Sequence, residues 1–147
     1  MTKNLVVAVD FDGTCLTHVY SANNPDVIGM PINSVEWLKK LSDAGVKIIL
    51  YTMRHDRHLL AAVMWFVENE IKLWGINENP DQHAWSASRK VYAQLYVDDA
   101  ALGCPLTTSS ISDRPYVNWS VVGPKLMKWA GIKMPRKKTN QPHILSI

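Results

Sequence analysis

The sequence contains few cysteines and no long hydrophobic run. Its two cysteines, Cys15 and Cys104, do not make the disulfide framework of a small secreted domain, so we expect a reducing, cytoplasmic setting. No uninterrupted apolar run approaches the roughly 20 residues needed to span a bilayer, and the residues around Lys3 and Asn4 lack the layout of a signal peptide. We therefore expect no membrane partner.

Acidic residues are missing from the end of the chain. The sequence has 16 basic and 13 acidic residues, a net charge of +3, yet no acidic residue follows Lys125. Six basic residues lie there: Lys125, Lys128, Lys133, Arg136, Lys137 and Lys138. The rest of the chain therefore has a net charge of −3. A weakly acidic body with a basic end suits a metal site beside a surface that faces a polyanion, although basic ends are also common as merely solvated segments.

Length and composition predict one globular domain. A chain of 147 residues can bury a sizeable core, and its 47% hydrophobic and 20% charged residues are typical of a soluble protein. Internal repeats and low-complexity tracts are absent. We predict a single domain over residues 1–132, with an irregular or hairpin-like flap at about residues 14–32, and a flexible basic tail over residues 133–147.

The first apolar run ends in two carboxylates. Residues 5–9 are consecutive apolar residues rich in valine, which predicts a strand buried on both faces. In extended backbone Asp10 and Asp12 point to the same side, while Gly13 lets the chain turn sharply. An ordinary strand that ends in an Asp-Gly turn is the plainer interpretation of this stretch alone.

Further elements alternate along the chain. We predict a helix that begins at Asn33 or Ser34 and stops at Gly45, and a last helix that is capped by Ser120 and followed by Gly131. Between them we expect a strand at 46–51, a helix at 56–73 closed by Gly75, a turn at 77–80, a strand at 93–97 and a short edge strand at 116–117. This alternation predicts a Rossmann-like, three-layer α/β sandwich with a mainly parallel sheet and no separate cap domain.

Reactive side chains follow each predicted strand of the sheet. Asp10 and Asp12 follow the first strand, Thr52 and Arg54 follow the second, and Asp98 and Asp99 follow the third. Ligands of parallel α/β sheets bind outside the carboxyl ends of the strands, so these side chains should meet. His55 and His58 have a spacing that can bind metal, but they lack nearby further ligands and are more simply surface residues.

The ordered set of motifs resembles the haloacid dehalogenase superfamily of phosphohydrolases. The resemblance rests on Asp-Phe-Asp-Gly-Thr at 10–14, Thr52, a basic residue at 89 or 90, and Asp98-Asp99, and it covers residues 4–103. The stretch Ser-Arg-Lys at 88–90 followed by Leu-Tyr-Val-Asp-Asp is similar to small bacterial and phage members. Superfamily members that cleave carbon–halogen bonds lack the second aspartate, so Asp12 favours phosphoryl transfer.

The resemblance implies a role for each motif residue. Asp10 matches the nucleophile that forms an aspartyl-phosphate, and Asp12 matches the acid and base. Thr52 and Lys90, with Arg89 as the alternative to Lys90, match the groups that hold the phosphoryl group, and Arg54 lies close enough in sequence to help bind it. Asp98 and Asp99 match Mg²⁺ ligands, together with Asp10 and the backbone carbonyl of Asp12. Mg²⁺ prefers such oxygen ligands and neutralises a phosphate that approaches a carboxylate.

The substrate is less well defined by the sequence. The short segments after residues 14 and 54 leave no room for a cap domain, so an open site should accept a bulky phosphate ester or be closed by a second subunit. The basic tail favours a nucleotide or nucleic-acid end. Two other functions fit the same acids: a nuclease that binds two Mg²⁺ ions, and a binding protein without catalysis. The nuclease interpretation gives Thr52 and Lys90 no particular role, and buried unpaired carboxylates are costly in a mere binding protein.

Overall fold

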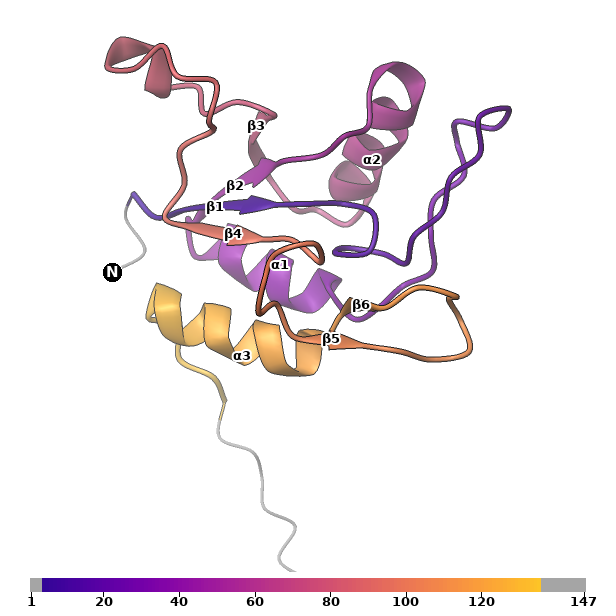
Figure 1. Cartoon of the computed structure of the whole chain (residues 1–147). Coiled ribbons are helices and arrows are strands. Elements are labelled where there is room, and N and C mark those ends of the chain that lie inside the picture. The colour runs from indigo at the N-terminus through magenta and orange to yellow at the C-terminus, as the bar shows by residue number, and fades with distance from the viewer. Residues whose placement is uncertain (1–3, 136–147) are drawn as a thin grey trace, which may run out of the picture.

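Four parallel strands form the central sheet of this protein. The structure is a computed structural model that describes residues 4–135. The strands are β1 (Val6–Val9), β2 (Lys47–Leu50), β3 (Leu73–Ile76) and β4 (Leu95–Val97), arranged in the order β3-β2-β1-β4 (Figure 1). All three strand pairs are parallel, so every strand presents its carboxyl end at the same edge. The predicted α/β class with a parallel sheet is therefore confirmed.

Three helices and a small second sheet complete the described fold. The helices are α1 (Val35–Asp43), α2 (Asp56–Glu68) and α3 (Trp119–Ala130), and α1 lies beside α3 (Figure 1). An antiparallel pair, β5 (Leu106–Thr107) and β6 (Tyr116–Val117), precedes α3, and a 3-10 turn, η1 (Gln82–Ala84), lies between β3 and β4. None of the helices described within residues 4–135 is long and apolar enough to cross a membrane.

The two faces of the sheet are covered differently. Val7 and Val9 of β1 belong to a large buried cluster that includes apolar residues of all three helices, such as Leu38, Phe66 and Leu126. The opposite face carries Val6, Ala8 and Ile49, which form a much smaller cluster completed by Val91, Ala93 and Trp74. The third layer of the predicted sandwich is therefore the irregular segment 77–94 rather than a helix.

Two glycines end helices as the sequence predicts, whereas the capping residues differ. Gly45 and Gly131 adopt positive φ angles of 87° and 70° after α1 and α3. Ser34 occupies the N-cap position of α1, but its hydroxyl donates to the carbonyl of Cys15 (2.6 Å) instead of capping the helix. The predicted cap Ser120 is wrong: Asn118 is the N-cap of α3, and its side chain accepts a hydrogen bond from the Ser120 N–H.

The predicted helix at 56–73 is too long. Helix α2 ends at Glu68, where the Asn69 side-chain amide donates to the carbonyl of Trp65 (2.8 Å). Glu70 then takes a left-handed conformation (φ 57°), so that Ile71 lies in the connection and Leu73 begins β3. Gly75 therefore lies inside a strand and does not close the helix. Helical spacing alone missed this edge strand.

The segment predicted as a flap forms an extended excursion beyond the carboxyl ends of the strands (Figure 1). Its two arms are joined near the base, where the Thr17 N–H donates to the carbonyl of Met30 (3.0 Å) and the Met30 N–H donates to Thr17 Oγ1 (2.8 Å). At its far part, Tyr20 stacks on His58 of α2. Most of the predicted basic tail, residues 136–147, lies outside the described residues.

Candidate active site

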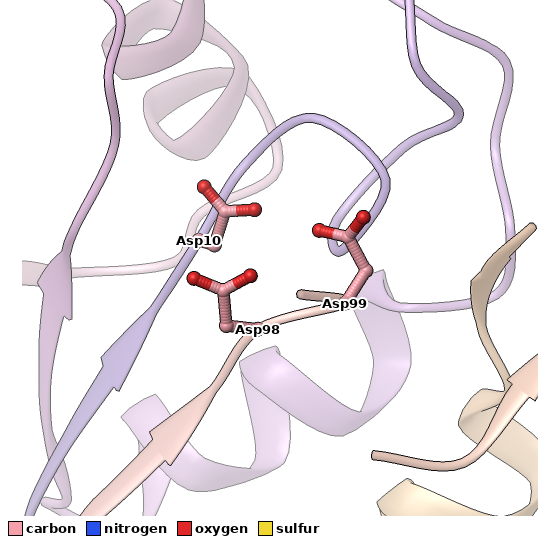
Figure 2. A group of neighbouring side chains, drawn as sticks. All are labelled: Asp10, Asp98 and Asp99. Carbon is pink, nitrogen blue, oxygen red and sulfur yellow. The ribbon is translucent and has the colours of Figure 1, made fainter. Parts of the chain in front are cut away.

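Three aspartates meet at the carboxyl ends of β1 and β4. Asp10 follows β1, Asp98 and Asp99 follow β4, and the backbone N–H of Asp10 donates to the carbonyl of Val97 (2.9 Å). One carboxylate oxygen from each of the three side chains lies within 4.8 Å of the others. Figure 2 shows the three carboxylates on one side of the strand ends, turned toward a shared space. The parallel pairing of neighbouring strands thus builds an acidic cluster.

Thr14 and His18 surround the third aspartate. Thr14 Oγ1 lies 3.1 Å from both Asp10 Oδ2 and Asp99 Oδ1, and it accepts a hydrogen bond from the Asp99 N–H (3.1 Å). His18 Nε2 lies 2.7 Å from Asp99 Oδ2. Sequence reasoning missed His18, because a histidine within an irregular segment carries no spacing signal. Only the folded flap brings it to the site.

The turn after the acids is fixed by close contacts. Gly13 has a positive φ of 79°, and a Cβ atom there would stand 2.0 Å from His18 Nε2. Its carbonyl accepts a hydrogen bond from the Val117 N–H of β6 (2.9 Å), and the carbonyl of Thr14 accepts one from Trp119 Nε1 of α3 (2.7 Å). The second sheet and the last helix therefore hold the acid-bearing loop in place.

Burial and like charge make the cluster electrostatically unfavourable without a cation. Burial of Asp10, its hydrogen bond with Asp99 and the negative charge of Asp98 raise the pKa of Asp10 to about 8. Burial alone would also raise the pKa of Asp99, but hydrogen bonds with Asp10, His18 and Thr14 hold that pKa below its ordinary value. Without a cation, these pKa values favour a proton on Asp10 and not on Asp99, and a bound cation would displace that proton.

Asp12 lies apart from this cluster and pairs with Arg54. Arg54 Nε and Nη2 donate to the two carboxylate oxygens of Asp12 (2.7 and 2.8 Å), and Arg54 Nη1 donates to the carbonyl of His58 (3.1 Å). The guanidinium also lies over the ring of Phe11, and its side chain is only 8% exposed. A bidentate pair of this kind fixes the direction of the Asp12 carboxylate. The carboxylate of Asp12 is not among the clustered metal-binding groups.

The remaining predicted site residues lie at two different places. Thr52 follows β2; its N–H donates to Asn77 Oδ1 (2.8 Å), and its hydroxyl accepts from the Arg54 N–H (3.1 Å). Lys90 and Arg89 are exposed in the segment before β4, and Lys90 Nζ lies 5.9 Å from the ring centre of Tyr96. Within the described residues, neither of these two cations forms an ion pair.

The histidine pair at 55 and 58 has other partners. His55 contacts Asp56 (3.1 Å), and His58 Nε2 lies 2.9 Å from the carbonyl of Ser21. His58 also stacks on Tyr20. These contacts join the start of α2 to the flap, which is consistent with the surface interpretation of the two histidines.

The donor set of the acidic cluster fits a hard divalent cation. It offers three carboxylates and no sulfur or nitrogen ligand, the set that Mg²⁺ and Ca²⁺ prefer. A positive ion would also relieve the repulsion that raises the Asp10 pKa. The two cysteines are free: Cys15 is buried and donates to the carbonyl of Asp10 (3.3 Å), and Cys104 is partly buried.

Comparison with known proteins gives one informative match. No protein-family model matches the chain, and no curated protein is similar to it. A solved structure of a conserved protein from Bacteroides thetaiotaomicron is 26% identical, with a TM-score of 0.65, over 85% of this chain and 91% of that chain. The α/β fold is therefore shared with a protein of nearly the same extent, for which no activity is stated.

Proposed function

We propose that this protein is a Mg²⁺-dependent phosphomonoesterase of the haloacid dehalogenase type, which works through an aspartyl-phosphate. The observation that carries the proposal is the convergence of Asp10, Asp98 and Asp99 at one edge of the sheet. A separate carboxylate, Asp12, is held two residues beyond Asp10 by Arg54. One acid inside a cation site and one outside it suit a nucleophile and a proton donor.

The proposed reaction has two steps. In the first, a carboxylate oxygen of Asp10 attacks phosphorus and the bond from phosphorus to the ester oxygen breaks. Asp12, which must then carry a proton in place of one of its Arg54 hydrogen bonds, gives that proton to the leaving oxygen. In the second, Asp12 takes a proton from water, whose oxygen attacks the same phosphorus and releases inorganic phosphate and the free Asp10 carboxylate. Such positioned acid and base groups typically contribute about 10²–10⁴-fold to the rate.

Other side chains would position the phosphoryl group. Asp10, Asp98 and Asp99 would hold the cation, with the Asp12 carbonyl as a further ligand, and bound Mg²⁺ would neutralise phosphate charge. Thr52, at the end of β2, donates a hydroxyl hydrogen bond to the phosphoryl oxygens, and Lys90 adds a positive charge. Arg54 is the further candidate for phosphate contact, because Asp12 and His58 take three of its five N–H donors.

Hydrolysis assays with and without Mg²⁺ test this proposal. Purified protein is incubated with a panel of phosphomonoesters, with Mg²⁺ or with excess chelator, and with end-labelled DNA. We expect phosphate release only with Mg²⁺ and no internal chain cleavage. Full turnover in chelator would show that the reaction does not need Mg²⁺. Cleavage within the DNA would favour the nuclease.

A trapped intermediate gives the second test. Asp12→Asn keeps the nucleophile and removes the acid and base, so it should slow the release of phosphate from Asp10 more than its attack on para-nitrophenyl phosphate, whose leaving group needs no proton. Intact-mass measurement after acid quench should detect one phosphate on Asp12→Asn and none on Asp10→Asn. Phosphate on another residue would overturn the assignment of the nucleophile.

A further inference from the structure

Exposed aromatic rings lie on the sheet face opposite α1, α2 and α3. Trp85, Tyr92, Tyr51 and Tyr96 are 62%, 44%, 39% and 38% exposed, although large aromatic side chains are normally well buried. Trp85 and Tyr92 contact each other edge to face (5.4 Å between ring centres), and Tyr51 contacts Tyr96 (6.3 Å). Exposed apolar groups gathered on one face mark an interaction site.

Strand register places part of this aromatic surface next to the acids. Val9 pairs with Leu50 of β2 and Val97 of β4, so the following residues Tyr51, Asp10 and Asp98 stand at one level on adjoining strands. Because side chains alternate along a strand, Ala8 and Tyr96, two residues earlier, share the face of Asp10 and Asp98. Ala8 is small, and the rings of Tyr51 and Tyr96 meet across it. Tyr51 and Tyr96 therefore lie beside the proposed reaction centre.

Tyr96 also lines a hollow in the surface. It has a volume of about 300 Å³ and is lined by aromatic rings, serines and one cation, chiefly Trp85, Tyr92, Tyr96, Ser86, Ser88 and Lys90. Lys90 Nζ lies on the Tyr96 ring, 5.9 Å from its centre. Flat apolar walls with one cation fit a flat aromatic group that carries negative charge nearby.

Buried Gln82 fixes the backbone of the segment that lines this hollow. Its side-chain amide donates to the carbonyls of Ser88 (3.2 Å) and Lys90 (2.7 Å), and its oxygen accepts from the Tyr92 N–H (2.8 Å). The Tyr96 hydroxyl donates to the carbonyl of Val91 (2.5 Å), which anchors the same segment to β4. These backbone groups of residues 88–92 are therefore hydrogen-bonded by Gln82 and Tyr96. The segment that carries the rings is thus held in place before a ligand binds.

We propose that this face is the leaving-group subsite and that it binds a nucleobase, so that the substrate is a nucleotide or the phosphorylated end of a nucleic-acid strand. The inference rests on the proposed function, since the phosphate would lie at Asp10. The base stacks on the aromatic rings, and Lys90, at the side of the hollow, meets the negative charge of the phosphoryl group. The neighbouring cation Arg89 is exposed, whereas Lys47 Nζ lies 3.8 Å from Asp81 Oδ2.

A pair of substrates that differ only in the base tests the subsite. AMP and ribose 5-phosphate share the ester and the sugar, and stacking of one base on aromatic side chains corresponds to about 5- to 150-fold in affinity. We expect kcat/KM for AMP to exceed that for ribose 5-phosphate by a factor in this range. Equal values, with both esters hydrolysed, would overturn the subsite and leave the proposed function intact. No hydrolysis of any ester would overturn the proposed function instead.

Binding without turnover supplies a second readout. In the Asp10→Asn background, calorimetry with AMP and with ribose 5-phosphate measures the contribution of the base directly. Tyr96→Leu should reduce the preference for AMP at least fivefold, whereas Tyr20→Leu, which removes an exposed ring stacked on His58 in the flap, should not. A preference that survives both Tyr96→Leu and Trp85→Leu would overturn the proposal.

Two further measurements separate the sources of the base and the competing occupant. A 5′-phosphorylated pentanucleotide that binds more tightly than AMP would identify a strand end, and equal affinity would identify a mononucleotide; both support the nucleobase. A second copy of the chain is the alternative occupant of an aromatic face. A stable dimer by light scattering that Tyr96→Lys dissociates, together with no preference for AMP, would overturn the proposal.

Discussion

At the scale of single residues, Asp10 carries the least favourable charge of the site. Its pKa of about 8 lies far above the ordinary value because of burial and its acidic neighbours. A raised carboxyl pKa means that the folded state binds the proton more tightly than the unfolded state. Its contribution to stability is therefore complete below about pH 4 and is lost as the pH rises through 8.

The raised pKa of Asp10 predicts that the free energy of unfolding depends on pH. Without metal, the free energy of unfolding of the wild type should fall between pH 5 and pH 8.5, whereas Asp10→Asn, which cannot ionise there, should fall less. Thermal unfolding in chelator at several pH values measures the difference. Asp26→Asn, an exposed carboxyl in the flap, is the matched control and should behave as the wild type. Parallel curves for the wild type and Asp10→Asn would contradict the raised pKa.

His18 is the residue that sequence reasoning missed, and we predict that it positions Asp99. Its Nε2 atom holds one oxygen of that carboxylate at 2.7 Å. Partners of metal-binding groups typically contribute about 10–100-fold to metal affinity. His18→Ala should therefore raise the Mg²⁺ concentration needed for half-maximal activity by about that factor, with less effect on kcat at saturating Mg²⁺.

A second histidine provides the control for this prediction. His55→Ala removes an exposed imidazole whose partners, Asp56 and His58, lie outside the acidic cluster, and it should leave the Mg²⁺ requirement unchanged. His18→Gln, which can still donate a hydrogen bond, should recover part of the lost affinity. An unchanged Mg²⁺ requirement in His18→Ala would show that Asp99 does not need this partner.

The two adjacent cations give the next prediction. Lys90→Ala should lower kcat/KM far more than Arg89→Ala, because only Lys90 is placed on Tyr96, on the side of the sheet that carries Asp10 and Asp98. Loss of one charged contact to a phosphoryl group is expected to cost about 10²–10³-fold. Steady-state kinetics on one phosphomonoester measures both variants. The opposite ranking would identify Arg89, and not Lys90, as the basic residue that contacts the phosphoryl group.

At the scale of elements, the contact between α1 and α3 is the tightest helix packing that the glycines reveal. A Cβ at Gly123 would stand 2.2 Å from the Trp37 ring. Overpacking of this kind costs about 1–3 kcal/mol, partly offset by the better helix propensity of alanine, which is worth up to about 1 kcal/mol. Gly123→Ala should therefore lower the free energy of unfolding by up to about 2 kcal/mol in urea, without changing kcat per folded molecule.

A double variant makes this prediction specific to the contact. Trp37→Leu removes the ring that the new methyl group would strike, so in that background Gly123→Ala should be neutral or stabilising. A destabilisation of the same size in both backgrounds would mean that the strain lies in the backbone of α3 and not against Trp37.

The elements also show how far a sequence can specify this structure. Strands β1, β2 and β4 are predictable because their apolar runs are short and are followed by polar residues. The Asp10–Asp98–Asp99 cluster follows from where parallel strands end. The end of α2 was missed because Ile71 and Leu73 continue a helical spacing while Glu70 turns the chain. The pairing of Asp12 with Arg54 depends on a contact 42 residues apart, which no local pattern encodes.

At the scale of the whole molecule, the proposed metal site should couple to folding. A ligand that binds only the folded state stabilises it by about 2.7 kcal/mol at 100 times its dissociation constant. For a chain of this size, Mg²⁺ should thus raise Tm by about 5–10 °C. Asp10→Asn or Asp98→Asn should abolish most of the shift, whereas K⁺ at equal ionic strength should not reproduce it. An identical shift in Asp98→Asn would place the cation elsewhere.

The pairing of β1 with β4 also sets the point in synthesis at which the acidic cluster can form. Thr14 and Asp99, which hydrogen-bond in the finished site, are 85 positions apart in the order of synthesis. During translation the first acid-bearing loop emerges long before its partners, and half a cation site has little affinity for a cation. A polypeptide released before Leu95 would therefore lack the complete acidic cluster. The cluster is complete only when β4 pairs with β1.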